Sequence, residues 1–246
     1  MPFITGGPRN IYDALRSQAQ HLVNWCAPHL CQVCGNISGG EPVCHECAAQ
    51  LMPNDCACPG CGWPGQNAVC RLCRQRQPGF DLAQAAFVYQ FPLDKLVQAF
   101  KYRQRLALVE YFARRLLCLP VVAEGGYDVI VPMPLHKARL RQRGFNQAVL
   151  LARSVARQQC KPLLLDGVLR LRNTPRQEGL SRRLRRANMR HVFQCTVRLD
   201  GQSVLVVDDV MTSGASAEAL ARALKMAGAA QVKIVVLART PLRLRY

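Results

Sequence analysis

Acidic residues, aromatic residues and long apolar runs are all scarce in this chain of 246 residues. Aspartate and glutamate number 15 against 33 lysines and arginines, and aromatic residues make up 7%. No stretch approaches the roughly 20 apolar residues that cross a bilayer, and residues 1–10 lack the apolar core of a signal peptide. We therefore expect a soluble, cytoplasmic protein without a membrane span. The formal net charge of +18 favours anionic partners.

Cysteine, in contrast, is abundant: ten of the 13 copies fall between Cys26 and Cys73. In a chain without an export signal, clustered cysteines bind metal more often than they form disulfides. Eight of them form four Cys-x2-Cys pairs in two halves with similar spacers, and each half offers the four thiolates of a tetrahedral zinc site. We predict one structural zinc per half; spacing alone leaves open a pairing across the halves or one empty half. The predicted ligands are Cys31, Cys34, Cys44 and Cys47 in the first half, and Cys58, Cys61, Cys70 and Cys73 in the second.

The distribution of charge predicts two domains. Residues 1–78 contain 5 basic and 4 acidic residues, whereas residues 79–246 contain 28 and 11. The pair Pro78-Gly79, after the last cysteine pair, is typical of a linker. We predict an N-terminal module over 1–78, with an amphipathic helix at 8–25 ahead of the cysteines, and an anion-binding domain over 79–246.

The most specific motif runs from Val204 to Ser216. Its first four residues are apolar and mostly β-branched, as in a parallel strand buried on both faces. Asp208 and Asp209 follow where we expect that strand to end, and a short loop then leads into a predicted helix. A helix N-terminus attracts phosphate, whereas paired carboxylates suit sugar hydroxyls or a divalent cation. The motif therefore predicts a sugar-phosphate site, with the phosphate at Thr212, Ser213, Gly214, Ala215 and Ser216.

This motif closely resembles the phosphoribosyl-pyrophosphate motif of the type I phosphoribosyltransferases. The resemblance implies an α/β fold with a doubly wound, mainly parallel sheet. It also implies that Asp208 and Asp209 hold the ribose hydroxyls and Mg²⁺ and that the loop holds the 5′-phosphate. A loop after an earlier strand grips the pyrophosphate in that family, and the matching residues here are Met133, Pro134, Leu135 and Lys137.

The resemblance becomes narrower when other segments are included. Double cysteine pairs, Val131-Pro132-Met133-Pro134 and the run from Arg141 to Gln147 together look like the ComF/GntX family of amidophosphoribosyltransferase-like proteins. That family implies a phosphoribosyl-pyrophosphate-binding protein of DNA uptake or utilisation, with single-stranded DNA and DNA-uptake or helicase proteins as partners. As an enzyme it would be a phosphoribosyltransferase of unassigned acceptor and catalytic residues. The alternative is a non-catalytic, zinc-containing DNA-binding adaptor with a relic or regulatory pocket.

A strongly basic segment lies between Asn173 and Arg190, where six arginines face one acid, Glu178. Like charges at this density repel one another unless an anion gathers them. Three interpretations stay open: a lid over phosphoribosyl pyrophosphate, a DNA contact and a solvated helix face. The residues chosen as lid or DNA contacts are Arg182, Arg183, Arg185 and Arg186.

Overall fold

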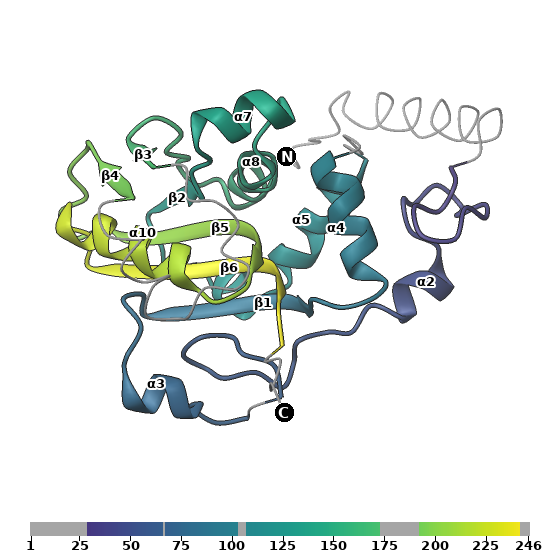
Figure 1. Ribbon diagram of the computed structural model, residues 1–246, viewed down its shortest axis with the longest axis horizontal. Helices are drawn as coiled ribbons and strands as arrows, with labels where there is room; N and C mark the ends of the chain where they lie inside the picture. Colours follow the sequence, from purple (N-terminus) through teal and green to yellow (C-terminus); the bar gives the residue numbers. More distant parts are fainter. Residues whose placement is uncertain (1–28, 66, 103–106, 173–191, 242–246) are drawn as a thin grey trace, which may run out of the picture. The chain divides into compact units, whose positions relative to one another are not determined.

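The computed structural model describes residues 29–65, 67–102, 107–172 and 192–241 (Figure 1). The predicted helix at 8–25 and the four arginines from Arg182 to Arg186 lie outside these ranges. By its internal contacts the chain forms two compact units, Met1–Gln50 and Leu51–Tyr246. The second cysteine half therefore belongs to the larger unit, whereas the predicted division at residue 78 groups both halves together. No helix within the described ranges is long and apolar enough to span a bilayer.

The two cysteine halves share one local structure, as the repeated spacing predicts. In the smaller unit Leu30 bridges Ile37 around the first cysteine pair, and the short helix α2 (His45–Ala49) begins after Cys44. Gly35 takes the left-handed conformation, with φ of 79°, in the turn after that pair.

The larger unit repeats this arrangement, with a spacer one residue shorter ahead of its helix. Ala57 bridges Pro64, Gly62 has φ of 65°, and helix α3 (Arg71–Gln75) begins after Cys70. Segment 52–54 then adds to the edge of the main sheet, because Pro53 bridges Phe87 in the antiparallel sense. This second cysteine half is thus attached directly to the sheet.

The main sheet has four strands, all parallel, in the order β1-β6-β5-β2. Its strands are β1 (Leu82–Val88), β2 (Val129–Pro132), β5 (Ser203–Met211) and β6 (Gln231–Arg239). In the two central strands, Val204–Val207 of β5 and Ile234–Ala238 of β6 are buried and apolar on both faces, which is the pattern that burial between two helical layers requires. The predicted parallel α/β sheet is confirmed.

Helices cover both faces of this sheet (Figure 1). Helices α5 and α8 pack on one face, and α10 packs on the other through Leu220 and Leu224. A short antiparallel pair of strands lies beside α10. The remaining elements are α4 (Leu93–Tyr102), α5 (Leu108–Leu117), α6 (Pro120–Ala123), α7 (Lys137–Arg143), α8 (Gln147–Gln159), α10 (Ala215–Met226), β3 (Val168–Arg170) and β4 (Phe193–Cys195).

Two elements of the structure depart from what the local sequence pattern suggests. The segment 163–171 reads as one strand in the sequence, but Leu163 only bridges Ile130 and β3 begins at Val168, after a bend at Asp166 and Gly167. The basic residues that follow the loop at Pro132 and Pro134 form helix α7. Apolar periodicity does not predict this helix because α7 has no buried residue.

Candidate functional site

Strand β5 sends its two adjacent carboxylates to opposite faces of the sheet. Successive residues of a strand alternate between faces, so Asp208 shares the α10 side with Val206, and Asp209 shares the other side with Val207. The strand continues to Met211, beyond the predicted end at Val207. The carboxylates therefore lie within the strand, where the backbone fixes their opposite directions.

Asp208 lines a hollow of about 370 Å³ at the carboxyl edge of the sheet. The loop between β5 and α10 and the first two residues of α10 line the same hollow, and together they contribute all five of the predicted phosphate-binding residues. Gly214 takes the left-handed conformation, with φ of 77°, directly before the first residue of α10. The N–H groups in the first turn of a helix have no intrahelical acceptor, so they are available to an anion.

The predicted pyrophosphate loop begins beside the same hollow. In the parallel pairing Pro132 lies opposite Val207, and the backbone N–H of Met133 donates to the Val207 carbonyl at 2.8 Å. Met133 therefore lines the hollow next to Asp208, and its carbonyl accepts a 3.1 Å hydrogen bond from the Asn146 side chain. Pro134 and Leu135 continue the loop.

Lys137, the last of the predicted pyrophosphate residues, is the exposed first residue of α7. Helix α7 also carries Arg139, Arg141 and Arg143, so several cations follow the loop directly. The structure therefore brings Asp208, the 212–216 loop and Met133 together around one hollow, with the basic helix beginning four residues beyond Met133.

Burial and the neighbouring Asp209 carboxylate raise the pKa of Asp208 to about 7. The charges of Lys101 and Arg170 act in the opposite direction but do not overcome them. A bound cation or a set of hydroxyl donors favours the ionised form of such a carboxylate. Asp208 is thus an acceptor whose charge is stabilised only when a ligand of that kind is present.

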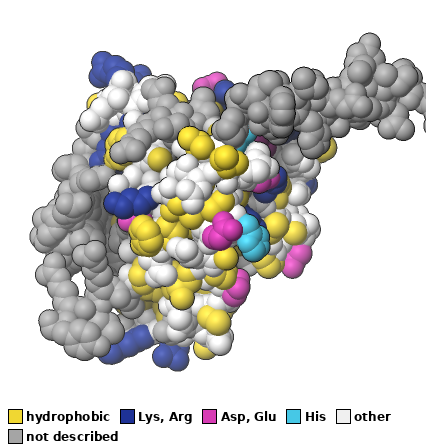
Figure 2. All heavy atoms as spheres, turned by 90° about the vertical axis from the view of Figure 1, so that its right-hand side faces the viewer, with side chains coloured by type: hydrophobic (Ala, Val, Ile, Leu, Met, Phe, Trp, Pro, Cys, Tyr) yellow, Lys and Arg dark blue, Asp and Glu magenta, His cyan; other side chains and the backbone are white. Residues whose placement is uncertain are grey.

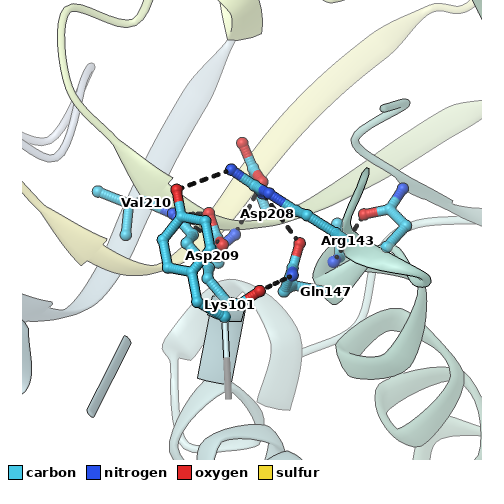
Figure 3. A network of polar contacts seen from close by, with 9 residues as sticks. Lys101, Arg143, Gln147, Asp208, Asp209 and Val210 are labelled. Atoms are coloured by element: carbon cyan, nitrogen blue, oxygen red, sulfur yellow. Dashed lines mark hydrogen bonds and ion pairs between the residues drawn. The ribbon is translucent and has the colours of Figure 1, made fainter. Parts of the chain in front are cut away.

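Asp209 enters a different set of contacts, which Figure 3 shows. Its Oδ2 atom lies 3.0 Å from Nζ of Lys101, at the end of α4, and Asp209 is not among the described residues that line the hollow. Gln147 joins the network by donating to the Lys101 carbonyl at 3.3 Å and accepting from Arg143 at 3.2 Å. The network ties α4 and the start of α8 to β5.

Sequence reasoning assigns no role to Lys101 or Gln147. In the sequence, Lys101 is a basic residue at the end of a predicted helix that is apolar on one face. The same pattern is usual at the solvated end of an ordinary helix, so it does not indicate a buried ion pair. Its partner becomes evident only when the chain folds, because 108 positions separate it from Asp209.

Both cysteine clusters have the dimensions of a zinc site. The four sulfur atoms of each half lie within 4.8 Å of one another. Individual S···S distances are 3.8 Å for Cys34 and Cys44, and 3.7 Å for Cys61 and Cys70. Tetrahedral coordination at a Zn–S distance of about 2.3 Å places sulfurs about 3.8 Å apart. The ligand sets fall within the halves as predicted, and the two four-cysteine groups fit zinc-ribbon sites.

Backbone N–H groups prepare the first sulfur of each cluster for metal binding. Burial acts to raise the pKa of Cys58, but hydrogen bonds from the N–H groups of Cys70, Cys61 and Gly60 outweigh it and lower the pKa to about 7. At Cys31 the equivalent donors outweigh burial and lower the pKa to about 6. In Cys61 burial dominates and raises the pKa to about 11. Four thiolates this close together repel one another, so full ionisation of a cluster requires a bound cation.

On the face shown in Figure 2, the basic side chains of described residues are scattered among hydrophobic and other side chains. The predicted lid or DNA contacts at Arg182, Arg183, Arg185 and Arg186 lie outside the described residues. Those roles stay predictions from the sequence.

Comparisons with known proteins give consistent matches. The model of a family described as "Phosphoribosyl transferase domain" matches residues 146–244. The DNA utilization protein YhgH of Escherichia coli (strain K12) is 31% identical over 222 residues, which cover 87% of this chain and 98% of that protein. Competence protein F of Haemophilus influenzae is 28% identical, with coverage of 85% and 90%, and competence protein ComFC of Bacillus subtilis (strain 168) is 30% identical, with coverage of 91% and 92%.

Proposed function

This chain belongs to the ComF/GntX family of phosphoribosyltransferase-like proteins, and we propose that it binds phosphoribosyl pyrophosphate with Mg²⁺ in the hollow beside Asp208. Relatives that are similar over most of their length carry the names of DNA utilization and competence proteins. On that basis we propose that this chain is a cytoplasmic protein of DNA uptake or utilisation and that it uses the bound sugar phosphate in that role.

One observation carries the binding proposal: a carboxylate and a helix N-terminus face the same hollow. Asp208 offers acceptors to vicinal hydroxyls of a ribose or to Mg²⁺. The N–H groups of the 212–216 loop offer donors to the 5′-phosphate of the same molecule. A sugar phosphate satisfies both walls at once, whereas an isolated phosphate leaves the carboxylate without a partner.

The proposal also names the residues beside the pyrophosphate group of the ligand. Met133 lines the hollow, and the loop leads into a helix with Lys137 and three arginines. Cations beside a departing pyrophosphate stabilise its developing charge, and Mg²⁺ would supply the same stabilisation when bound. Transfer of the ribosyl group is a further step that this site favours, and pyrophosphate release in the presence of candidate acceptors measures it.

Two glycines provide a matched test of the binding proposal. Gly214 in the phosphate loop and Gly201 in a distant turn both have positive φ, of 77° and 72°. Alanine is strained at either position, by about 1 kcal/mol. We expect Gly214→Ala to weaken phosphoribosyl-pyrophosphate binding about tenfold in calorimetry and Gly201→Ala to leave it unchanged. Equal affinities in the two variants, or no binding by the native protein, would contradict the proposal.

A second function, binding of single-stranded DNA, is favoured by the distribution of charge. Residues 79–246 contain 28 basic and 11 acidic residues, and DNA affinity depends on how many phosphates such residues contact. As an adaptor, the protein would bind DNA whether or not phosphoribosyl transfer occurs. Titration of single-stranded DNA with and without saturating phosphoribosyl pyrophosphate separates independent sites from a shared one.

A further inference from the structure

Arg239, the last residue of β6, connects the second cysteine cluster to the phosphate-binding loop. It is only 2% exposed, and its guanidinium donates to three backbone carbonyls. Nη1 donates to Met211 at 2.8 Å and to Thr212, and Nε donates to Cys61 at 3.3 Å. The guanidinium carbon also lies 5.3 Å from the centre of the Trp63 ring.

The cysteine side of this connection is fixed to the sheet. Gly60 accepts a 3.1 Å hydrogen bond from the Ala83 N–H, and Gly62 accepts a 2.9 Å bond from the Asn54 side chain. A Cβ on Gly62 would lie 2.9 Å from the Ala83 carbonyl oxygen, so the turn that holds Cys61 packs tightly against β1. The Cys61 carbonyl therefore cannot shift without disturbing β1 or Arg239.

The loop side is the phosphate site itself. Met211 and Thr212 are the residues that lead from β5 into the loop, and both line the hollow. A buried guanidinium is costly unless its N–H groups have acceptors, and losing one acceptor removes a charge-assisted hydrogen bond. The position of the Cys61 carbonyl and the conformation of the loop after Met211 consequently depend on one another through the side chain of Arg239.

Metal loading changes the charge and the rigidity of the second cysteine cluster. Four thiolates with one zinc ion carry a net charge of about −2, which favours a buried cation nearby. Loss of the ion removes the bonds that hold Cys61 to the other three ligands, which loosens the turn around Cys61.

We propose that Arg239 is a positioning residue that couples metal loading of the second cysteine cluster to sugar-phosphate binding by the 212–216 loop. The inference rests on the proposed function of that loop. With metal bound, Cys61 and Trp63 hold the guanidinium where it fixes the Met211 and Thr212 carbonyls and so aims the following N–H groups at phosphate. Coupling is reciprocal, so a bound sugar phosphate must also retain the metal.

Zinc release from the full-length protein tests this reciprocity. Ribose 5-phosphate is the suitable probe because it has the 5′-phosphate but no pyrophosphate group to extract zinc. Transfer of zinc to the indicator 4-(2-pyridylazo)resorcinol is followed with and without saturating ribose 5-phosphate. At equilibrium with the indicator, we expect the ligand to raise the affinity for one of the two zinc equivalents about five- to tenfold, within the usual range of coupling between sites.

Two variants show which cluster the ligand protects from zinc loss and whether Arg239 is required for that protection. Cys34→Ser removes the first cluster, and the remaining zinc should show the full protection. Arg239→Met should abolish the protection while both zinc ions still bind. Protection that persists in Arg239→Met, or that belongs to the first cluster, would overturn the inference.

A spectroscopic readout avoids any change at Arg239. The chain has two tryptophans, so Trp25→Phe leaves Trp63 as the sole tryptophan fluorophore. Ribose 5-phosphate should change Trp63 emission with the same midpoint as calorimetric binding, because the ring contacts the guanidinium. Binding without protection of zinc and without an emission change overturns the coupling alone. Binding of phosphoribosyl pyrophosphate without any binding of ribose 5-phosphate overturns the inference alone, whereas absence of binding of both ligands overturns the proposed function with it.

Discussion

Nζ of Lys101 lies 3.0 Å from Oδ2 of Asp209, and both side chains are largely buried. Adjacent Asp208 points to the other side of the sheet and lines the hollow. The sequence presents the two carboxylates as one acidic pair, but in the fold one is part of an internal ion pair and the other faces the candidate ligand site. They should therefore respond differently to substitution.

Asp209→Asn should lower stability. The substitution leaves the largely buried Lys101 ammonium without its counter-charge, and breaking a buried pair in this way costs about 3–5 kcal/mol. We expect a loss near the lower end of that range in the free energy of unfolding, measured with urea. The double variant Lys101→Met, Asp209→Leu is the control and should recover most of it. A loss below about 0.5 kcal/mol in the single variant, which is within the range of exposed pairs, would mean that the buried pair is not formed in solution.

Asp208→Asn should increase stability, and only at neutral and higher pH. The pKa of Asp208 is raised from its ordinary value of 3.8 to about 7, so the folded state binds the proton more tightly than the unfolded chain. Stability from this group is present below about pH 4 and is lost as pH rises to about 7.

At pH 8 the asparagine variant should therefore exceed the native protein by roughly 1–3 kcal/mol, since one pKa unit corresponds to about 1.4 kcal/mol. At pH 4 the two should be equal. Urea unfolding at both values measures the difference, and a gain that is the same at pH 4 and pH 8 would show that the carboxylate is not titrating as described.

Loss of one cysteine should have different consequences in the two clusters. Native protein should contain about two zinc ions per chain, and Cys34→Ser or Cys61→Ser should each contain about one. Because Cys61 belongs to the larger compact unit, its loss should lower the unfolding midpoint of that unit, whereas Cys34→Ser should leave the midpoint unchanged. Freshly purified, reduced protein without zinc would refute the assignment of both clusters.

The basic segment gives a prediction that rests on sequence alone. Replacing Arg182, Arg183, Arg185 and Arg186 with glutamine should weaken single-stranded DNA binding and reduce its salt slope by about 2–3, at roughly 0.7 per lost phosphate contact. A lid role predicts weaker phosphoribosyl-pyrophosphate binding and an unchanged DNA slope. Titrating both ligands at several salt concentrations decides between the two.

Much of the architecture follows from local patterns. The apolar runs at Val129 and Val204 predict buried parallel strands because burial on both faces excludes polar residues from them. Repeated cysteine spacing predicts both four-cysteine groups because thiolate ligands need fixed offsets. These features depend on residues that are close in the sequence.

Features that depend on distant contacts escape such reasoning. Neither the pairing of Lys101 with Asp209 nor the contacts of Arg239 with Cys61 and Thr212 has a local signature. The attachment of the second cysteine half to β1 is equally long-range, through Ala83 and Gly60. Composition groups the two halves into one module, whereas hydrogen bonds to the sheet place the second half in the larger unit.

Asp208 is the residue on which the proposed function depends most, because we propose that its carboxylate holds the ribose of phosphoribosyl pyrophosphate. Calorimetric titration of this ligand with Mg²⁺, on native protein and on Asp208→Asn at pH 8, tests that role directly. We predict a loss of about 1.5–3 kcal/mol in binding free energy, the scale of hydrogen bonds to a charged group, in a variant that is folded and more stable than the native protein. Equal affinity of the two proteins for phosphoribosyl pyrophosphate would contradict this role of Asp208.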